Sequence, residues 1–219
     1  MQAFFLDLDG TLIDPKEGIT LSIQHALSAL GVEDIPSQNE LTWCIGPPLR
    51  NSFEVLLGEG ADVERAIGLY RERYAEEGIF EAEPYDGIGE MLEELRDLTP
   101  ALWIATSKPQ IYAQTIADHF GISNYIDGVF GAEMDGERSD KTELLTHALN
   151  ETGADPARCI MLGDRQHDIF GARNNDIPSI GALWGYGEEG ELHMAEADGL
   201  AGDPEEVTEI AADLLGIEL

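Results

Sequence analysis

Short, uniformly apolar segments alternate along this chain with longer segments in which apolar residues recur at helical spacing. Strands that are apolar on both faces are typical of a parallel sheet covered by helices on both sides. The alternation therefore predicts an α/β fold with a parallel sheet. The predicted strands are residues 3–6, 101–105, 126–130, 159–162 and 178–183, and the clearest helices between them lie near residues 88–95, 111–120 and 141–149.

One region departs from this alternation. Between residues 14 and 84 the sequence has helical patterns, at residues 19–30 and 63–74, and no convincing strand. The run Gly46-Pro47-Pro48-Leu49 interrupts this region and predicts the start of a further helix. We therefore expect an all-helical domain at residues 15–83, inserted into a core domain formed by residues 1–14 and 84–219.

The chain is strongly acidic. Among its 219 residues, 44 are Asp or Glu and 12 are Lys or Arg, which gives a formal net charge of −32. A surface of this charge repels polyanions, so we expect no nucleic acid and no membrane among the partners. With 43% hydrophobic residues the chain can still bury a sizeable core. Of two interpretations, an ordinary acidic protein and an adaptation to concentrated salt, we favour the second, because salt screens self-repulsion.

The two cysteines, Cys44 and Cys159, lie far apart in the sequence and form no CxxC pair. Reduced thiols are the simplest expectation for such cysteines. No apolar run reaches the length of a membrane span. The first predicted strand follows Met1 almost directly, without a basic segment before it, which argues against a secretory signal. These features together predict a cytoplasmic protein.

Polar side chains that can take part in catalysis follow four of the predicted strands. They are Asp7 and Asp9 after the first strand, Thr106, Ser107 and Lys108 after the second, Lys141 after the third, and Asp164 and Asp168 after the fourth. Ligands of open α/β sheets bind beyond the carboxyl ends of the strands, so we expect these side chains to converge. Clustered carboxylates repel one another unless a cation holds them together or some stay protonated. A set of oxygen ligands favours Mg²⁺ as that cation.

Taken in order, these residues resemble the four motifs of the haloacid dehalogenase superfamily of phosphohydrolases, and the resemblance covers nearly the whole chain. The helical insert between the first two motifs is similar to the C1 type of cap domain in that superfamily. Residues 46–49, 70–74, 105–109 and 184–187 further resemble its phosphoglycolate phosphatase-like and 5′-nucleotidase-like branch. The resemblance implies a Rossmann-like core with a mobile helical cap.

The resemblance also implies a role for each aspartate. Asp7 would attack phosphorus and form an aspartyl-phosphate, and would give one carboxylate oxygen to Mg²⁺. Asp9 would bind the metal through its backbone carbonyl and use its side chain as the general acid and base. Asp164 would be the second metal carboxylate, and Asp168 a ligand through water or a residue that orients the ligands. For Asp168 the alternative is an acid at a helix start, favoured by the helix dipole.

Donor groups are needed to stabilise charge on the phosphate oxygens. The resemblance assigns this role to the Thr106 hydroxyl, the Lys141 ammonium and the backbone N–H groups of Leu8 and Gly10. Ser107, next to Thr106, is a further candidate contact. The alternatives without a catalytic role are an ordinary helix cap for Thr106 and a surface lysine for Lys141.

Other residues are candidate substrate contacts on less evidence. Lys108 either touches phosphate or belongs to a helix start. Gly46 and Arg50 would reach the substrate from the helical domain, and a plain helix entry is the alternative there. Trp184 and Tyr186 either line the rim of the pocket or pack against the core.

The implied function is a Mg²⁺-dependent phosphatase acting on a small phosphorylated metabolite, either phosphoglycolate or a nucleoside 5′-monophosphate, as a monomer or homodimer. No residue separates the two substrates. One alternative is a phosphomutase of the same superfamily, in which a sugar hydroxyl accepts the phosphoryl group. The other is a non-catalytic acidic module that binds a metal or a partner, and the complete set of motifs argues against it.

Overall fold

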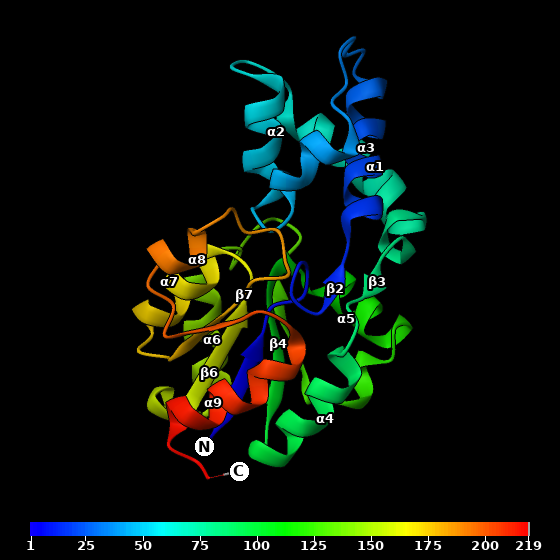
Figure 1. Ribbon diagram of the computed structural model, residues 1–219. Coiled ribbons are helices and arrows are strands. Elements are labelled where there is room, and N and C mark those ends of the chain that lie inside the picture. Colours follow the sequence, from blue (N-terminus) through cyan, green and yellow to red (C-terminus); the bar gives the residue numbers. More distant parts are fainter. Residues whose placement is uncertain (219) are drawn as a thin grey trace. The chain divides into compact units, whose positions relative to one another are not determined.

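The computed structural model describes residues 1–218. The chain divides into two compact units, one formed by Met1–Asp14 and Pro84–Leu219 and the other by Pro15–Glu83. Figure 1 shows the elements of each unit in chain order. Among the described residues, no helix combines the length and the apolar character that crossing a lipid bilayer requires.

The first unit is built on a six-stranded sheet in the order β5-β4-β1-β6-β7-β8, and all its neighbouring strands are parallel. β1 lies inside the sheet, where Phe4 pairs with Leu102 of β4 and Ala3 pairs with Cys159 of β6. The strands are β1 (Ala3–Leu6), β4 (Leu102–Pro109), β5 (Gly128–Ala132), β6 (Cys159–Gly163), β7 (Ser179–Ala182) and β8 (Gly199–Ala201). Two short strands, β2 (Ile13–Asp14) and β3 (Glu83–Pro84), lie where the chain passes between the units.

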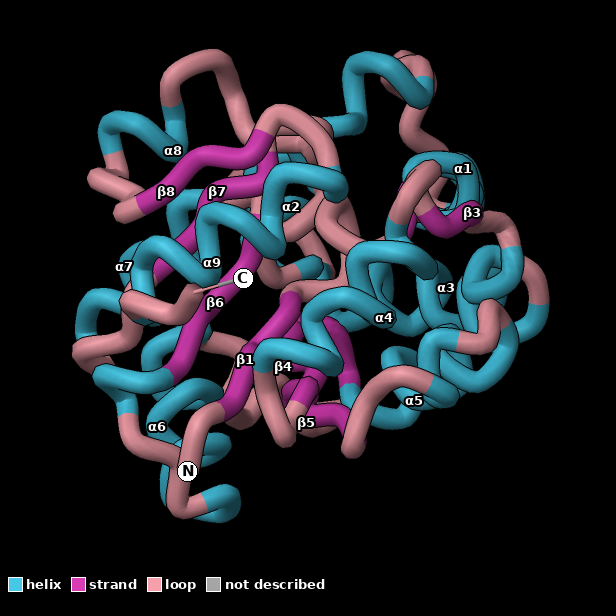
Figure 2. The backbone as a smooth tube through the Cα atoms, turned by 60° about the horizontal axis from the view of Figure 1, so that its bottom comes forward, coloured by secondary structure: helices cyan, strands magenta, loops and turns pink. Residues whose placement is uncertain are grey.

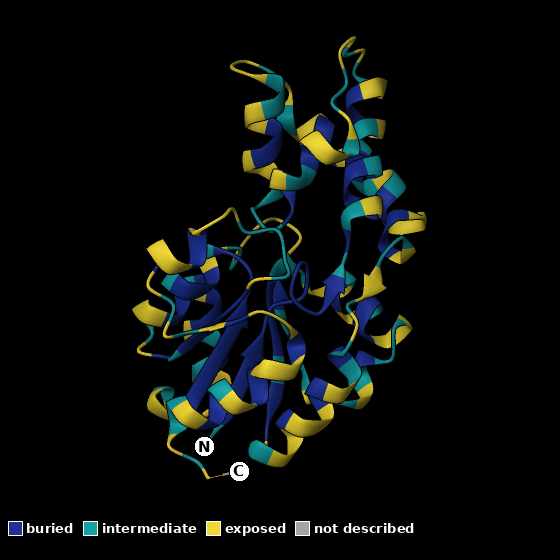
Figure 3. Ribbon diagram, in the orientation of Figure 1, coloured by how far each residue is buried: buried dark blue, intermediate teal, exposed yellow. Residues whose placement is uncertain are grey.

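Helices cover both faces of this sheet (Figure 2). They are α4 (Ile88–Leu98), α5 (Gln110–His119), α6 (Lys141–Thr152), α7 (Gln166–Asn174), α8 (Glu191–Met194) and α9 (Val207–Leu215). α6 packs against α7 on one face, and α4 packs against α9 on the other. All four residues of β1 are consequently buried, and Figure 3 shows the sheet as the buried centre of this unit. Burial on both faces explains why the strands are uniformly apolar.

The second unit is helical. It contains α1 (Lys16–Ala29), α2 (Leu49–Leu57), α3 (Val63–Glu76) and two short 3₁₀ helices, Gln38–Cys44 and Gly78–Phe80. α3 packs against both α1 and α2, because its apolar stripe includes Tyr70 and Tyr74, whose rings stack with their centroids 5.1 Å apart. The guanidinium of Arg73 pairs with Glu81 at 2.8 Å within the same unit.

The parallel α/β architecture expected from the sequence is confirmed, and the differences lie at strand ends. β4 runs to Pro109 instead of ending at Ala105, because a register shift between Thr106 and Pro109 lets it continue its pairing with β5. β8 was not expected, since a three-residue edge strand that begins with a glycine has no apolar run to reveal it.

Candidate active site

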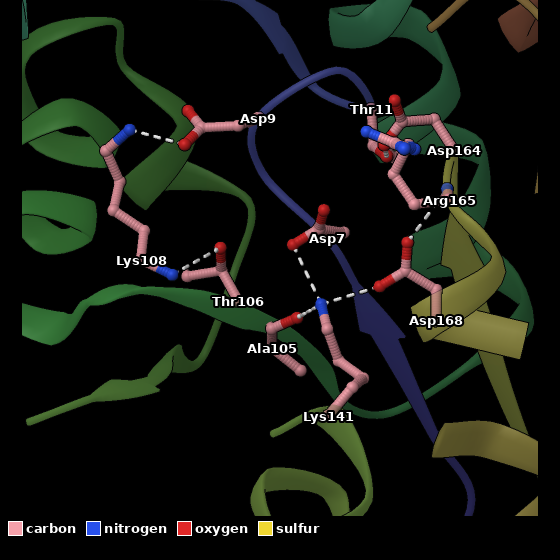
Figure 4. A network of polar contacts seen from close by, with 10 residues as sticks. All are labelled: Asp7, Asp9, Thr11, Ala105, Thr106, Lys108, Lys141, Asp164, Arg165 and Asp168. Carbon is pink, nitrogen blue, oxygen red and sulfur yellow. Dashed lines mark hydrogen bonds and ion pairs between the residues drawn. The ribbon is translucent and has the colours of Figure 1, made fainter. Parts of the chain in front are cut away.

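Three of the predicted aspartates meet at the carboxyl end of the sheet (Figure 4). Asp7 follows β1, Asp164 follows β6, and Asp168 lies in the first turn of α7. Each offers a carboxylate oxygen, and these three oxygens lie within 4.8 Å of one another on buried residues. The sheet order explains this arrangement, because β1 and β6 are neighbours and parallel strands end at the same edge.

Lys141, the first residue of α6, is buried among these carboxylates. Its ammonium lies 2.9 Å from Asp7 Oδ1, 2.6 Å from Asp168 Oδ1 and 2.8 Å from the backbone oxygen of Ala105. An ammonium has three N–H donors, so these three acceptors match its full capacity. In this structure Lys141 thus holds Asp7 and Asp168, and its expected contact with phosphate stays a prediction. Burial alone would lower the pKa of Lys141, but the charges of Asp168 and Asp7 outweigh it and raise that pKa.

The carboxylates of this cluster are kept out of water and near one another. Burial, with the repulsion of Asp7 and Asp168, raises the pKa of Asp164 well above its usual range. Burial also raises the pKa of Asp168 to about 6, although the Lys141 ammonium acts in the opposite direction. When all three carboxylates are ionised, one ammonium leaves the cluster with two excess negative charges. The cluster is thus short of positive charge.

The Asp9 side chain is not part of this cluster and pairs with a different lysine. The Lys108 ammonium lies 2.5 Å from Asp9 Oδ2, whereas Asp9 Oδ1 is buried and has no hydrogen-bond partner among the described residues. Burial is the largest influence on this carboxyl and raises its pKa. Lys108 therefore contacts one of the predicted catalytic aspartates, and its contact with phosphate stays a prediction.

The turn after β1 depends on a glycine. Gly10 has φ +85°, and a Cβ at this position would lie 2.3 Å from Asp164 Oδ2, so only a glycine fits. The N–H of Gly10 donates to the backbone oxygen of Ile13 at 2.9 Å. This corrects the expectation that it faces phosphate, because closure of the turn uses the donor. Leu8 is fully buried in the same turn, and its backbone oxygen accepts from Leu12 at 2.9 Å.

The remaining candidates divide between the two units. The hydroxyl oxygen of buried Thr106 accepts from the N–H of Lys108 at 3.3 Å, and its O–H is still able to donate. Ser107 is half-buried beside it. Gly46 and Arg50 belong to the helical unit, where Arg50 is exposed and pairs with Glu64, and their contact with substrate stays a prediction.

Sequence reasoning missed the groups that hold Asp164 and the start of α7. The Thr11 hydroxyl donates to Asp164 Oδ1 at 3.2 Å, and the N–H of Tyr186 donates to Asp164 Oδ2 at 2.7 Å. Glu191 accepts from the N–H of Gln166 at 2.7 Å. Thr11 could have been found from its place beside Gly10, whereas Glu191 has no local signal, since it comes from a distant part of the chain.

Comparison with known proteins decides the family. A sequence model of the haloacid dehalogenase-like hydrolase family matches residues 4–182. The chain belongs to this family. As a haloacid dehalogenase-like hydrolase it is 43% identical over 187 residues to a 5′-nucleotidase from Pseudomonas aeruginosa, a match that covers 85% of this chain and 84% of the relative.

Two further similarities of this haloacid dehalogenase-like hydrolase are to a protein named as a kinase and to a structure named as a phosphatase. It is 39% identical over 186 residues to the tyrosine-protein kinase PtkA of Mycobacterium tuberculosis, which covers 85% of this chain but 63% of that longer relative. Its fold matches the crystal structure of a predicted phosphatase from Clostridium acetobutylicum with a TM-score of 0.92 and 33% identity, over 97% of this chain and 98% of the other. The hydrolase is accordingly an enzyme of the phosphatase type.

Proposed function

We propose that this hydrolase is a Mg²⁺-dependent phosphatase of small phosphorylated metabolites, with nucleoside 5′-monophosphates as its main class of substrate. The 43% identity to a 5′-nucleotidase over most of both chains supports this substrate class. Phosphoglycolate, the other ester expected from the sequence, is the competing substrate.

The side chains of the acidic cluster fit a divalent cation. Asp7, Asp164 and Asp168 present oxygen atoms within 4.8 Å of one another, and Mg²⁺ prefers oxygen ligands. Two positive charges would balance the excess that Lys141 leaves uncompensated. Asp7 and Asp164 would hold the ion with their carboxylates, assisted by Asp168 and the Asp9 backbone carbonyl. When bound, Mg²⁺ supplies positive charge beside the phosphate oxygens.

Asp7 is the proposed nucleophile. Lys141 fixes this carboxylate through its contact with Oδ1 at 2.9 Å, so that it is already oriented when substrate arrives. An oxygen of Asp7 attacks phosphorus, and the bond between phosphorus and the leaving-group oxygen breaks as the aspartyl-phosphate forms. The Thr106 hydroxyl donates to a phosphate oxygen during this step.

Asp9 is the proposed proton carrier. Its Oδ1 is buried without a partner in the described part of the chain, and burial favours its protonated form by raising its pKa. Asp9 gives its proton to the departing alkoxide and later takes a proton from the water that attacks the aspartyl-phosphate. That attack releases inorganic phosphate and restores the Asp7 carboxylate.

The observation that carries the proposal is a group of three neighbouring buried carboxylates with too little positive charge to balance them, those of Asp7, Asp164 and Asp168. The test is turnover of p-nitrophenyl phosphate in EDTA and after addition of Mg²⁺. We expect turnover only with Mg²⁺, and none in Asp7→Asn. Asp118→Asn, the same change at an exposed position of α5, is the control that keeps activity.

Turnover that is indifferent to EDTA, or an active Asp7→Asn enzyme, would refute the mechanism. A screen of nucleoside 5′-monophosphates against phosphoglycolate then tests the substrate class, and a preference for phosphoglycolate would replace that part of the proposal. Isomerisation of a sugar phosphate without release of inorganic phosphate would indicate a phosphomutase instead.

A further inference from the structure

The loop of residues 184–187, which follows β7, packs directly against Asp164. The N–H of Tyr186 donates to Asp164 Oδ2 at 2.7 Å. A Cβ on Gly185 would lie 2.3 Å from Asp164 Cβ, and a Cβ on Gly187 would lie 2.4 Å from the Asp164 backbone oxygen. Real Cβ atoms do not approach other atoms so closely, so both positions require glycine. The loop backbone therefore lies too close to Asp164 to leave room for a side chain at either position.

Two aromatic side chains anchor this loop to the core unit. The indole N–H of Trp184 donates to the backbone oxygen of Thr11 at 3.0 Å, and the hydroxyl of Thr11 donates in turn to Asp164 Oδ1 at 3.2 Å. The Tyr186 hydroxyl bonds the Asp14 carboxylate and also contacts the Tyr85 hydroxyl. One oxygen of Asp164 is thus held by the loop itself, and the other by a threonine that the loop also holds.

We propose that the loop of residues 184–187 is a positioning element for the metal site, which fixes Asp164 in the orientation needed to bind a divalent cation. This inference rests on the proposed function, because it assumes a cation at the acidic cluster. Asp164 is fully buried beside two further carboxylates, and their repulsion would turn an unsupported carboxylate away from them. The loop opposes that rotation before the cation arrives.

A positioning role predicts a change in the dissociation constant for Mg²⁺ and little change in kcat. The loop acts on the cation through Asp164, so weakening it lowers the affinity for Mg²⁺, while the rate of the fully loaded enzyme stays nearly the same. Groups that orient metal ligands typically change metal affinity by roughly 10- to 100-fold when they are removed. A loop that merely packs against the core would lower thermal stability without this selective effect on affinity.

The test uses conservative aromatic substitutions. Trp184→Phe keeps a ring and removes the donor to Thr11, and Tyr186→Phe removes the hydroxyl that bonds Asp14 but keeps the N–H that bonds Asp164. Trp103→Phe is the matched control, because the indole nitrogen of Trp103 is buried and has no hydrogen-bond partner among the described residues. Mg²⁺ binding to metal-stripped protein is measured by calorimetry, and kcat is measured with p-nitrophenyl phosphate at saturating Mg²⁺.

We expect the dissociation constant for Mg²⁺ to rise roughly tenfold in Trp184→Phe and Tyr186→Phe, with kcat nearly unchanged, and neither constant to change in Trp103→Phe. Wild-type affinity in both loop variants would overturn the inference, as would an equal loss in Trp103→Phe. If the proposed function is wrong, the wild-type protein itself binds no Mg²⁺. That result would overturn both the proposed function and the positioning role of the loop. Thermal midpoints of the metal-free variants establish that each one folds.

Discussion

The ammonium of Lys108 lies 2.5 Å from Asp9 Oδ2, while Asp9 Oδ1 is buried and has no hydrogen-bond partner in residues 1–218. One oxygen of the carboxyl is thereby fixed and the other is left for proton exchange. Lys108 comes from the end of β4, and Asp9 from the turn after β1, so the neighbouring strands set this contact. We infer from this geometry that Lys108 positions Asp9, the proposed general acid.

This role makes the effect of Lys108→Met depend on the leaving group. Without the ammonium, Asp9 is free to rotate, and protonation of the departing oxygen becomes less efficient. We expect kcat/KM to fall by roughly 100-fold for a nucleoside 5′-monophosphate, whose alkoxide needs a proton. The fall should be much smaller for p-nitrophenyl phosphate, whose leaving group departs without one. Arg96→Met, which removes one charge from an ion pair with Asp127 at the surface, is the control. Equal losses with both substrates would contradict this role.

Lys141→Met should destabilise the metal-free protein, because it leaves Asp7 and Asp168 buried without their cation. Removing one partner of a buried ion pair typically costs about 3–5 kcal/mol, measurable by urea unfolding near neutral pH. Arg173→Met breaks an ion pair with Glu196 whose side chains are 51% and 81% exposed, and should cost about 1 kcal/mol or less. Similar small losses in the two variants would show that Lys141 does not stabilise the cluster.

The acidic cluster should also set the pH dependence of stability in EDTA. Burial raises the pKa of Asp168 to about 6 and that of Asp164 well above its usual range. A carboxyl whose pKa is higher in the folded state binds its proton more tightly when the protein is folded. Its contribution to the free energy of unfolding is therefore complete at low pH and is lost as pH rises through the folded pKa. The thermal midpoint should therefore fall between pH 5 and pH 7.5, and Mg²⁺ should stabilise most at the higher pH.

The control for this pH dependence is Asp168→Asn. This variant keeps His167. Burial lowers the pKa of His167, so its contribution to stability increases as pH rises, opposite to that of the carboxyls. The midpoint of wild-type protein in EDTA should fall more steeply than that of Asp168→Asn between the two pH values. A steeper fall in the variant, or no difference, would show that Asp168 does not titrate in this window.

The net charge of −32 predicts a salt dependence of substrate binding. The Debye length is about 10 Å at 0.1 M salt and about 3 Å at 1 M, so concentrated salt screens the repulsion between this protein and an anionic substrate. Lowering the ionic strength at saturating Mg²⁺ should raise KM more than it lowers kcat. Steady-state kinetics over a KCl series measures both constants, and a KM that does not respond to salt would count against the prediction.

The sequence was sufficient for the residues that directly follow strands. Asp7 and Asp164 were found because each comes after a fully apolar run, and the parallel sheet carries such positions to one edge. The contacts of Lys141 could not be predicted from the sequence, because one acceptor is the backbone oxygen of Ala105 on β4, far away in the chain. The N–H of Gly10 was assigned to phosphate, whereas the geometry of the turn directs it to Ile13. Pairings of this kind depend on tertiary distances that no local pattern encodes.

The central place of β1 also affects how the protein is made. Ala3 leaves the ribosome long before its partner Cys159 is translated. Until β6 is made, the side of this apolar segment that pairs with β6 has no partner strand, and pairings between such distant residues form slowly. An exposed apolar strand attracts chaperones and neighbouring chains. Truncation before β6 should accordingly yield insoluble product during expression, even though β1 and β4 would both be present.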